Sequence, residues 1–122
     1  IVEIRKINAG TPVSYGGVWT AKKDTHIGVV QSGFADGVPR PWIENGTVGY
    51  RGKRYPIAGR ICMDQLTVDF GDDDIAIGDD VLFWGEDHGI QISTEEISRD
   101  ILSTPYVIFT GLSNRVKRIP VF

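Results

Sequence analysis

The sequence lacks the residues that build covalent cross-links and metal sites. Cys62 is its only cysteine, so no internal disulfide can form, and a reducing, cytoplasmic compartment is expected. His26 and His88 have no cysteine or second histidine at metal-ligand spacing. The acidic run Asp72–Asp74 lacks the alternating oxygen ligands of a calcium-binding loop and is expected to form a solvated turn. We therefore expect no bound metal.

Long apolar runs and an excess of positive charge are also missing. No apolar run approaches the length needed to cross a bilayer, so no membrane contact is expected. The formal net charge is −3, with acidic and basic residues interspersed. The basic cluster Arg115, Lys117 and Arg118 is expected to form one solvated face of a terminal strand. These features disfavour a nucleic-acid-binding small barrel.

What is present suits one folded domain over residues 1–122. The chain is long enough for one substantial apolar core but too short for two. It opens at Ile1 without a methionine, and Val2 and Ile4 indicate that it starts inside a strand. We therefore expect a piece of a longer protein, so the absence of a targeting signal here says little about the parent protein.

Short runs of β-branched and aromatic residues alternate with glycine-containing turns. This pattern predicts an all-β fold, a closed or partly closed antiparallel barrel with one or two short helices near the C-terminus. Tyr50–Tyr55 predicts a hairpin in which Gly52 supplies a positive φ. The expected strands are Ile1–Ile7, Pro12–Tyr15, Val18–Ala21, His26–Gln31, Thr47–Tyr50, Arg54–Ile57, Leu66–Phe70, Asp80–Trp84 and Arg115–Val121.

One helix is well signalled. Ser93 precedes Glu96 by three residues, a capping-box spacing, and an apolar stripe follows at Ile97, Ile101 and Leu102. Pro105 interrupts this helix, and a shorter helical turn over 106–112 is expected before the last strand. Earlier, the stretch from Ser32 to Asn45 is rich in proline and glycine, and we expect an ordered functional loop there.

Several motifs stand out in order along the chain. They are Val13-Ser14-Tyr15-Gly16-Gly17, Gly33-Phe34-Ala35-Asp36-Gly37-Val38-Pro39-Arg40, Gly59-Arg60-Ile61-Cys62-Met63-Asp64-Gln65, Thr104-Pro105-Tyr106 and Ser113-Asn114-Arg115-Val116. Each alone is compatible with an ordinary turn or strand end. In this order and spacing they resemble the C-terminal domain of the alanine racemases, over essentially the whole chain.

The resemblance implies an enzyme that interconverts L- and D-alanine, a peptidoglycan precursor, with pyridoxal 5′-phosphate as its cofactor. The cofactor acts as an electron sink for removal of the Cα proton. Inversion needs acid/base groups on both faces of the substrate. In this family they are a lysine of an N-terminal (β/α)8 barrel, which also binds the cofactor, and a tyrosine matched here by Tyr15. A free phenol has a pKa near ~10, so nearby cations and donors must stabilise its phenolate.

Other residues acquire substrate-binding roles from the same resemblance. The backbone N–H of Met63 is expected to bind the substrate carboxylate, because charge-assisted hydrogen bonds to an anion are strong. Arg60 and Asp64 match residues near the entrance of the active site, and Arg40 matches an arginine of the same corridor. Asp36, in an Asp-Gly turn pair, is expected to be structural. Cys62 is expected to be a buried, unreactive side chain.

Two positions depart from the family pattern. Phe34 stands where a tyrosine hydroxyl usually faces the active site, so that hydrogen bond is absent. Asn114 stands where some relatives carry a tyrosine that contacts the cofactor phosphate, and its amide is expected to be a weaker cofactor contact of shorter reach.

The resemblance also implies partners. In the family, the C-terminal domain joins an N-terminal barrel domain and covers the barrel mouth of the second subunit in a head-to-tail homodimer. The isolated chain is therefore expected to be inactive. Two alternatives stay open: a racemase for serine or another amino acid, which Phe34 favours, and a non-catalytic β-barrel dimerisation or binding module.

Overall fold

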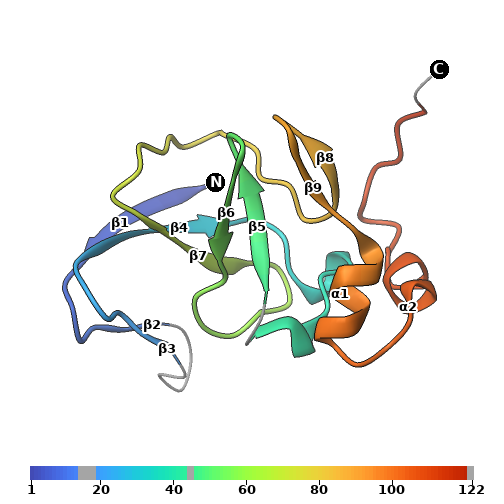
Figure 1. Cartoon of the computed structure of the whole chain (residues 1–122), viewed down its shortest axis with the longest axis horizontal. Coiled ribbons are helices and arrows are strands. Elements are labelled where there is room, and N and C mark those ends of the chain that lie inside the picture. Colours follow the sequence, from blue (N-terminus) through green and yellow to red (C-terminus); the bar gives the residue numbers. More distant parts are fainter. Residues whose placement is uncertain (14–18, 44–45, 121–122) are drawn as a thin grey trace.

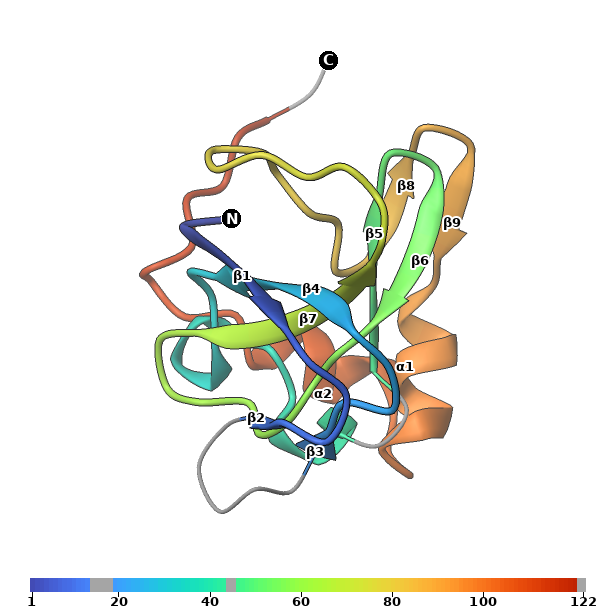
Figure 2. The same ribbon diagram turned by 90° about the vertical axis from the view of Figure 1, so that its left-hand side faces the viewer.

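The computed structural model of the chain describes residues 1–13, 19–43 and 46–120. Strands gather on one side of the molecule and the α-helices pack against the other (Figures 1 and 2). The elements follow in this order: β1 (Glu3–Ile7), β2 (Pro12–Val13), β3 (Trp19–Thr20), β4 (Thr25–Val30), η2 (Phe34–Asp36), η3 (Arg40–Ile43), β5 (Thr47–Tyr50), β6 (Lys53–Pro56), β7 (Leu66–Gly71), β8 (Gly85–Asp87), β9 (Ile90–Ile92), α1 (Thr94–Asp100) and α2 (Pro105–Thr110).

Strand β4 is the centre of an antiparallel sheet with the order β1-β4-β7. Five of its six residues are buried, in keeping with the β-branched run of Ile27, Val29 and Val30. Gly28 lies within this run because a Cβ there would stand only 2.6 Å from the ring of Phe70. The glycine therefore lets an aromatic ring of β7 lie across the middle of β4.

The remaining described strands form antiparallel pairs, β2–β3, β5–β6 and β8–β9. The predicted β5–β6 hairpin is confirmed: Arg51 and Gly52 join the strands with φ angles of 47° and 82°. Two successive positive φ values match the right-handed twist of the flanking strands. The β8–β9 hairpin is absent from the sequence-based prediction, because Gly85, Glu86 and Asp87 have no apolar alternation.

Isolated pairings connect the sheets to one another. Ile57, which follows β6, bridges to Val68 of β7. Gly49 of β5 exchanges two backbone hydrogen bonds of 2.8 Å with Leu82. Residues 78 and 79 in turn bond to the backbone of Ile1 at 2.8 Å. The contacts thus pass from β1 across β4, β7, β6 and β5 to the segment 78–82, although the named strands of the described residues do not by themselves form a closed barrel.

One large apolar core lies between the strands and the helices. Its largest fully buried side chains are Trp42 of η3 and Phe70 of β7. Helix α1 buries Ile97 and α2 buries Ile108 in this core. The predicted cap is confirmed, since Ser93 Oγ accepts a 3.1 Å hydrogen bond from the backbone N–H of Glu96. A stretch expected to be a loop therefore also contributes to the core through Trp42.

Several sequence-based expectations are wrong in the described part of the chain. Residues 80–84 are not a strand: apart from the bridge at Leu82, they pack apolar side chains against the core without a ladder. Residues 115–120 are irregular and form no strand, and the side chain of Arg115 pairs with Asp36 and Asp64. Cys62 is exposed: its backbone bonds to Phe34 and Gln65, while its thiol makes only a 4.0 Å contact with the carbonyl of Arg60.

The helical stripe predicted through Leu102 is also shorter than expected. Helix α1 ends at Asp100, and Leu102 has a positive φ of 56° and is 93% exposed. In the described residues no helix is long and apolar enough to span a membrane.

Candidate functional site

The first motif is described only at its edges. Tyr15 lies outside the described residues, as do Ser14, Gly16 and Gly17. The flanking strands β2 and β3 are described, with Val13 opposite Trp19. Val13 packs in a small cluster with Ala58, which directly precedes the third motif. Val13, at the described edge of the first motif, therefore lies beside the start of the Gly59–Gln65 segment.

The second and third motifs lie against each other. The N–H of Phe34 donates to the carbonyl of Cys62 at 2.9 Å, and the N–H of Ala35 donates to the carbonyl of Met63 at 3.0 Å. Gly33 makes this approach possible, because a Cβ there would stand 2.1 Å from the oxygen of Cys62. We call this contact between residues 33–36 and 62–64 the loop junction. It brings together segments that are far apart in the sequence.

The loop junction fixes the direction of the Met63 amide. The carbonyl of Cys62 and the N–H of Met63 belong to one planar trans peptide, so they point in opposite directions. Since this carbonyl faces Phe34, the Met63 N–H points away from η2. It has no hydrogen-bond acceptor in the described part of the chain, and Met63 as a whole residue is 54% exposed. An outward-facing donor is thus available at the surface.

Asp36 has the structural role that the sequence predicts. Its Oδ2 accepts a 2.9 Å hydrogen bond from the backbone N–H of Gly33, which caps η2. Gly37 follows with a φ of 109°, a conformation that favours glycine. The carboxylate therefore stabilises the turn that contacts Cys62 and Met63.

Arg115 connects this turn to the third motif. Its Nε lies 3.2 Å from Oδ1 of Asp36, and its Nη1 lies 2.7 Å from Oδ1 of Asp64. The hydrogen bond to Asp64 and the charge of Asp36 raise the pKa of the Arg115 guanidinium. Arg115 is half-exposed, as expected of a solvated face, but it does not lie on a strand. Both of its partners come from distant segments. The only signal in the sequence is its place in a matched motif.

The remaining predicted site residues lie near this junction or on the surface. The guanidinium of Arg40 lies 4.8 Å from the centre of the Phe34 ring, a cation–π contact. Arg60 and Asn114 are exposed. Where the family pattern has a tyrosine hydroxyl, this chain therefore has an apolar ring in contact with a cation.

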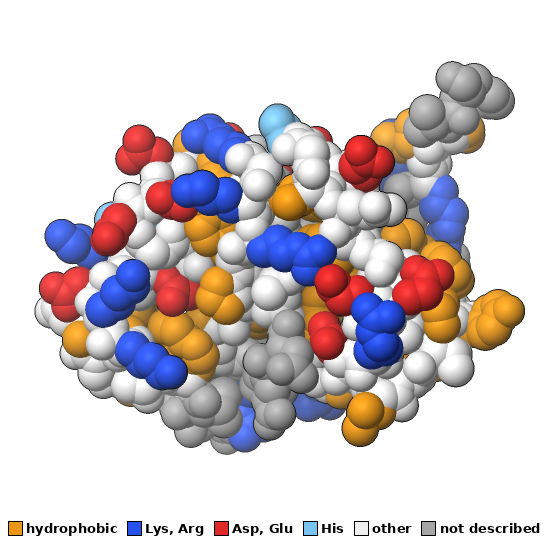
Figure 3. Space-filling view, viewed as in Figure 1, with side chains coloured by type: hydrophobic (Ala, Val, Ile, Leu, Met, Phe, Trp, Pro, Cys, Tyr) orange, Lys and Arg blue, Asp and Glu red, His pale blue; other side chains and the backbone are white. Residues whose placement is uncertain are grey.

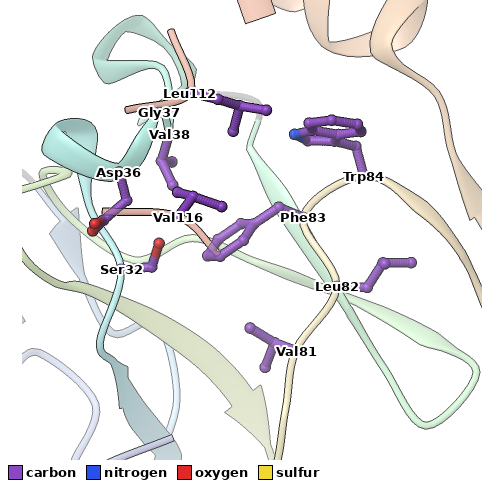
Figure 4. Close-up of a pocket in the computed structure, with 10 residues that line it drawn as sticks. All are labelled: Ser32, Asp36, Gly37, Val38, Val81, Leu82, Phe83, Trp84, Leu112 and Val116. Atoms are coloured by element: carbon purple, nitrogen blue, oxygen red, sulfur yellow. The ribbon is translucent and has the colours of Figure 1, made fainter. Parts of the chain in front are cut away.

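A cavity of about 300 Å³ lies behind the loop junction. Figure 4 shows the ring of Phe83 pointing toward Val116 of the C-terminal loop, whereas Leu82 points away from it. Its lining includes Val38, Phe83, Leu112 and Val116, together with Asp36. The predicted substrate-binding residues Met63, Arg40 and Arg60 are not among the lining residues, so this cavity is separate from the predicted site.

Basic and acidic side chains are interspersed on the face seen in Figure 3, so this face has no large patch of one charge. Hydrophobic side chains protrude at the helical end of the same face. The exposed apolar residues at this end include Leu102, Tyr106, Val107 and Phe109.

A family model described as the C-terminal domain of alanine racemase matches residues 1–120. The chain belongs to this family. Curated alanine racemases are close in sequence: the protein of Shewanella sp. (strain W3-18-1) is 44% identical over 117 residues, and that of Vibrio cholerae is 42% identical over 119. These alignments cover 95% and 96% of this chain and 32% of each relative. The chain therefore spans about a third of the length of these alanine racemases.

Solved alanine racemase structures share the fold. The enzyme of Streptomyces coelicolor A3(2) matches with a TM-score of 0.90 and 33% identity, covering 97% of this chain and 31% of the other. That of Streptomyces lavendulae matches with a TM-score of 0.88 and 34% identity, covering 94% and 30%. The resemblance to the alanine racemases is thus confirmed in both sequence and structure.

Proposed function

We propose that this chain is the C-terminal part of a pyridoxal phosphate-dependent alanine racemase, in which it supplies the tyrosine acid/base, Tyr15. The observation that supports the proposal is the loop junction, which leaves the Met63 N–H facing away from η2. Val13, which ends β2 two residues before Tyr15, packs with Ala58 at the start of the same segment. The Met63 N–H suits the carboxylate of an amino acid. Tyr15 would then move the proton on one face of the substrate Cα.

Among the matched site residues of this chain, only a hydrogen-bond donor for the cofactor phosphate is expected. Pyridoxal phosphate, when bound, supplies the electron sink that makes the Cα proton removable. Asn114 has an exposed amide that can donate a hydrogen bond to a phosphate oxygen. The neighbouring Arg115 is already paired with two carboxylates. In this proposal the lysine that holds the cofactor belongs to the N-terminal barrel domain.

The charged residues near the loop junction would admit the substrate. Arg40, Arg60 and Asp64 supply both signs of charge, as a zwitterionic amino acid requires. Arg40 is held over the Phe34 ring, which fixes its position without a hydroxyl. In this proposal Met63 binds through its backbone, so its side chain is free to vary.

The assembly we propose is a cytoplasmic homodimer in which each chain completes the partner's active site. The apolar side chains exposed at the helical end suit a surface covered by another domain. The isolated chain would have no racemase activity. We also propose that the strands form a closed barrel through the irregular segment 78–82, since this segment bonds to both Ile1 and Gly49.

Replacing Tyr15 by phenylalanine in the full-length protein tests its role. We expect kcat for racemisation to fall by roughly 10²- to 10⁴-fold, because one acid/base is lost. In D2O, only one alanine enantiomer should still exchange its Cα hydrogen, through the remaining base on the other face. Ile77→Ala, at a residue that is 67% exposed and outside the matched motifs, is the control and should leave the rate unchanged. Near-normal rates in both directions for Tyr15→Phe would remove Tyr15 from the mechanism.

Phe34 favours a second candidate, a racemase for serine or another amino acid. Loss of a polar group at the edge of a pocket alters which side chains are accepted. Comparing kcat/KM for alanine, serine and lysine decides between the two functions. A protein that dimerises without pyridoxal absorbance would instead be a non-catalytic module.

A further inference from the structure

We propose that Arg115 is a positioning residue for substrate binding: its guanidinium holds the two loops that orient the Met63 N–H. The inference rests on the proposed function, in which that N–H binds the substrate carboxylate. Arg115 touches neither substrate nor cofactor in this proposal. It acts through Asp36 on one side and Asp64 on the other.

The first step runs through Asp36. One oxygen of this carboxylate pairs with Arg115 and the other accepts from the Gly33 N–H. Both oxygens are therefore engaged, and the side chain is only 16% exposed. Through Asp36, the charge of Arg115 thus stabilises the turn that places the Phe34 N–H against the Cys62 carbonyl.

The second step runs through Asp64, which directly follows Met63. Its carboxylate lies 2.7 Å from Arg115 Nη1, a charge-assisted hydrogen bond. The Met63 carbonyl on the same stretch is held by the Ala35 N–H. The peptides on both sides of the Met63 Cα are therefore fixed on the η2 side, and Arg115 holds the residue that follows them.

The planar guanidinium suits this task. It presents donors in different directions at fixed angles, so one side chain can pair with two carboxylates from separate loops. A lysine carries the same charge as a single point and lacks this fork. A lysine at position 115 should therefore keep only part of the function of the arginine, which has two partners.

The test uses the full-length protein with Arg115→Gln, and with Lys117→Gln as the matched control. Lys117 is an exposed cation two residues away, so its variant removes the same charge from the same segment. Propionate and ethylamine serve as ligand probes: they correspond to alanine without its amino group and without its carboxyl group. Steady-state kinetics give KM and kcat, and inhibition by each probe gives its dissociation constant.

We expect Arg115→Gln to raise KM for alanine and the dissociation constant of propionate by about tenfold, the change for a weakened charge-assisted hydrogen bond. The value of kcat should change by less than about threefold, because binding of ground state and transition state weakens alike. Ethylamine inhibition should be unchanged. Arg115→Lys should lie between wild type and Arg115→Gln, which also provides the measurement if the glutamine variant does not fold.

Three results would overturn the inference. They are unchanged propionate inhibition in both Arg115 variants, equal weakening of propionate and ethylamine, and the same effect in Lys117→Gln. A wild-type protein that does not racemise alanine would instead overturn the proposed function. Propionate titration of the variants would still decide whether Arg115 orients a carboxylate-binding amide.

Discussion

The loop junction and the aromatic core hold distant segments together by different means. In the core, the rings of Tyr50, Tyr55 and Phe70 contact one another with centroids 5.0–6.2 Å apart. At the loop junction, backbone hydrogen bonds and a half-exposed arginine perform this task. Apolar contacts are strong but non-directional, whereas hydrogen bonds fix orientation. The core should therefore supply most of the stability, and the junction most of the precision of ligand binding.

The largest expected effect on stability is in the core. Phe70 is 1% exposed and lies across β4 at Gly28. Phe70→Ala should lower the free energy of unfolding by about 3–5 kcal/mol through lost burial and a cavity. Denaturant unfolding measures this loss. Ile77→Ala, at a residue that is 67% exposed, is the control and should change stability by less than about 0.5 kcal/mol. Equal losses at both positions would contradict the distinction between core and surface.

The next largest effect should appear at the loop junction. Gly33→Ala places a Cβ 2.1 Å from the Cys62 oxygen, so the loops must separate at a cost of about 1–3 kcal/mol. The KM for alanine should rise as well, because the Met63 amide turns with them. Gly10→Ala is the control: its φ is +88° with no atom within 4 Å of the new Cβ. It should be destabilised by a similar amount through backbone strain, but with KM unchanged. If KM rose equally in Gly33→Ala and Gly10→Ala, the result would contradict a specific role of the loop junction in ligand binding.

The smallest effect concerns the polar edge of the core. Burial, followed by the hydrogen bond to Asp73, raises the pKa of Tyr55 to about 12. The folded state therefore keeps this proton when the unfolded chain, with a pKa near 10, has lost it. Stability contributed by Tyr55 is fully present below about pH 10 and is lost as the pH rises towards about 12.

Tyr55→Phe should remove this part of the alkaline dependence and cost about 0.5–1.5 kcal/mol at neutral pH, the net value of one hydrogen bond. Urea unfolding between pH 8 and 12 measures both quantities. An unchanged alkaline slope would show that other groups titrate there.

The elements that could be predicted from the sequence are those in which the local pattern and the tertiary packing favour the same structure. The strand at Leu66–Phe70, the turn at Gly52 and the cap at Ser93 all follow from local signals, and all are confirmed. The segment 80–84 was misassigned because its apolar residues serve the core without pairing as a strand. Periodicity indicates burial, but it does not show whether the backbone is paired.

The candidate site could likewise be predicted where its signals are local, and not where they depend on the fold. Its motifs could be found from their order, and Asp36 has the structural role expected from its turn. The ion pairs of Arg115 could not be found, because its partners lie in two separate loops and only the fold brings them together. Cys62 was expected to be buried from its apolar neighbours, yet here the chain uses a carbonyl and leaves the thiol outside.

The peptide between Cys62 and Met63 has one further consequence. Because the group is a rigid plate, a rotation imposed at its oxygen turns its nitrogen by the same angle. A change in the turn around Phe34 is thus transmitted to the opposite face of the plate without any side chain moving there. Substitutions in the turn around Phe34 would therefore alter the direction of the Met63 N–H, while every residue that contacts a ligand stays the same.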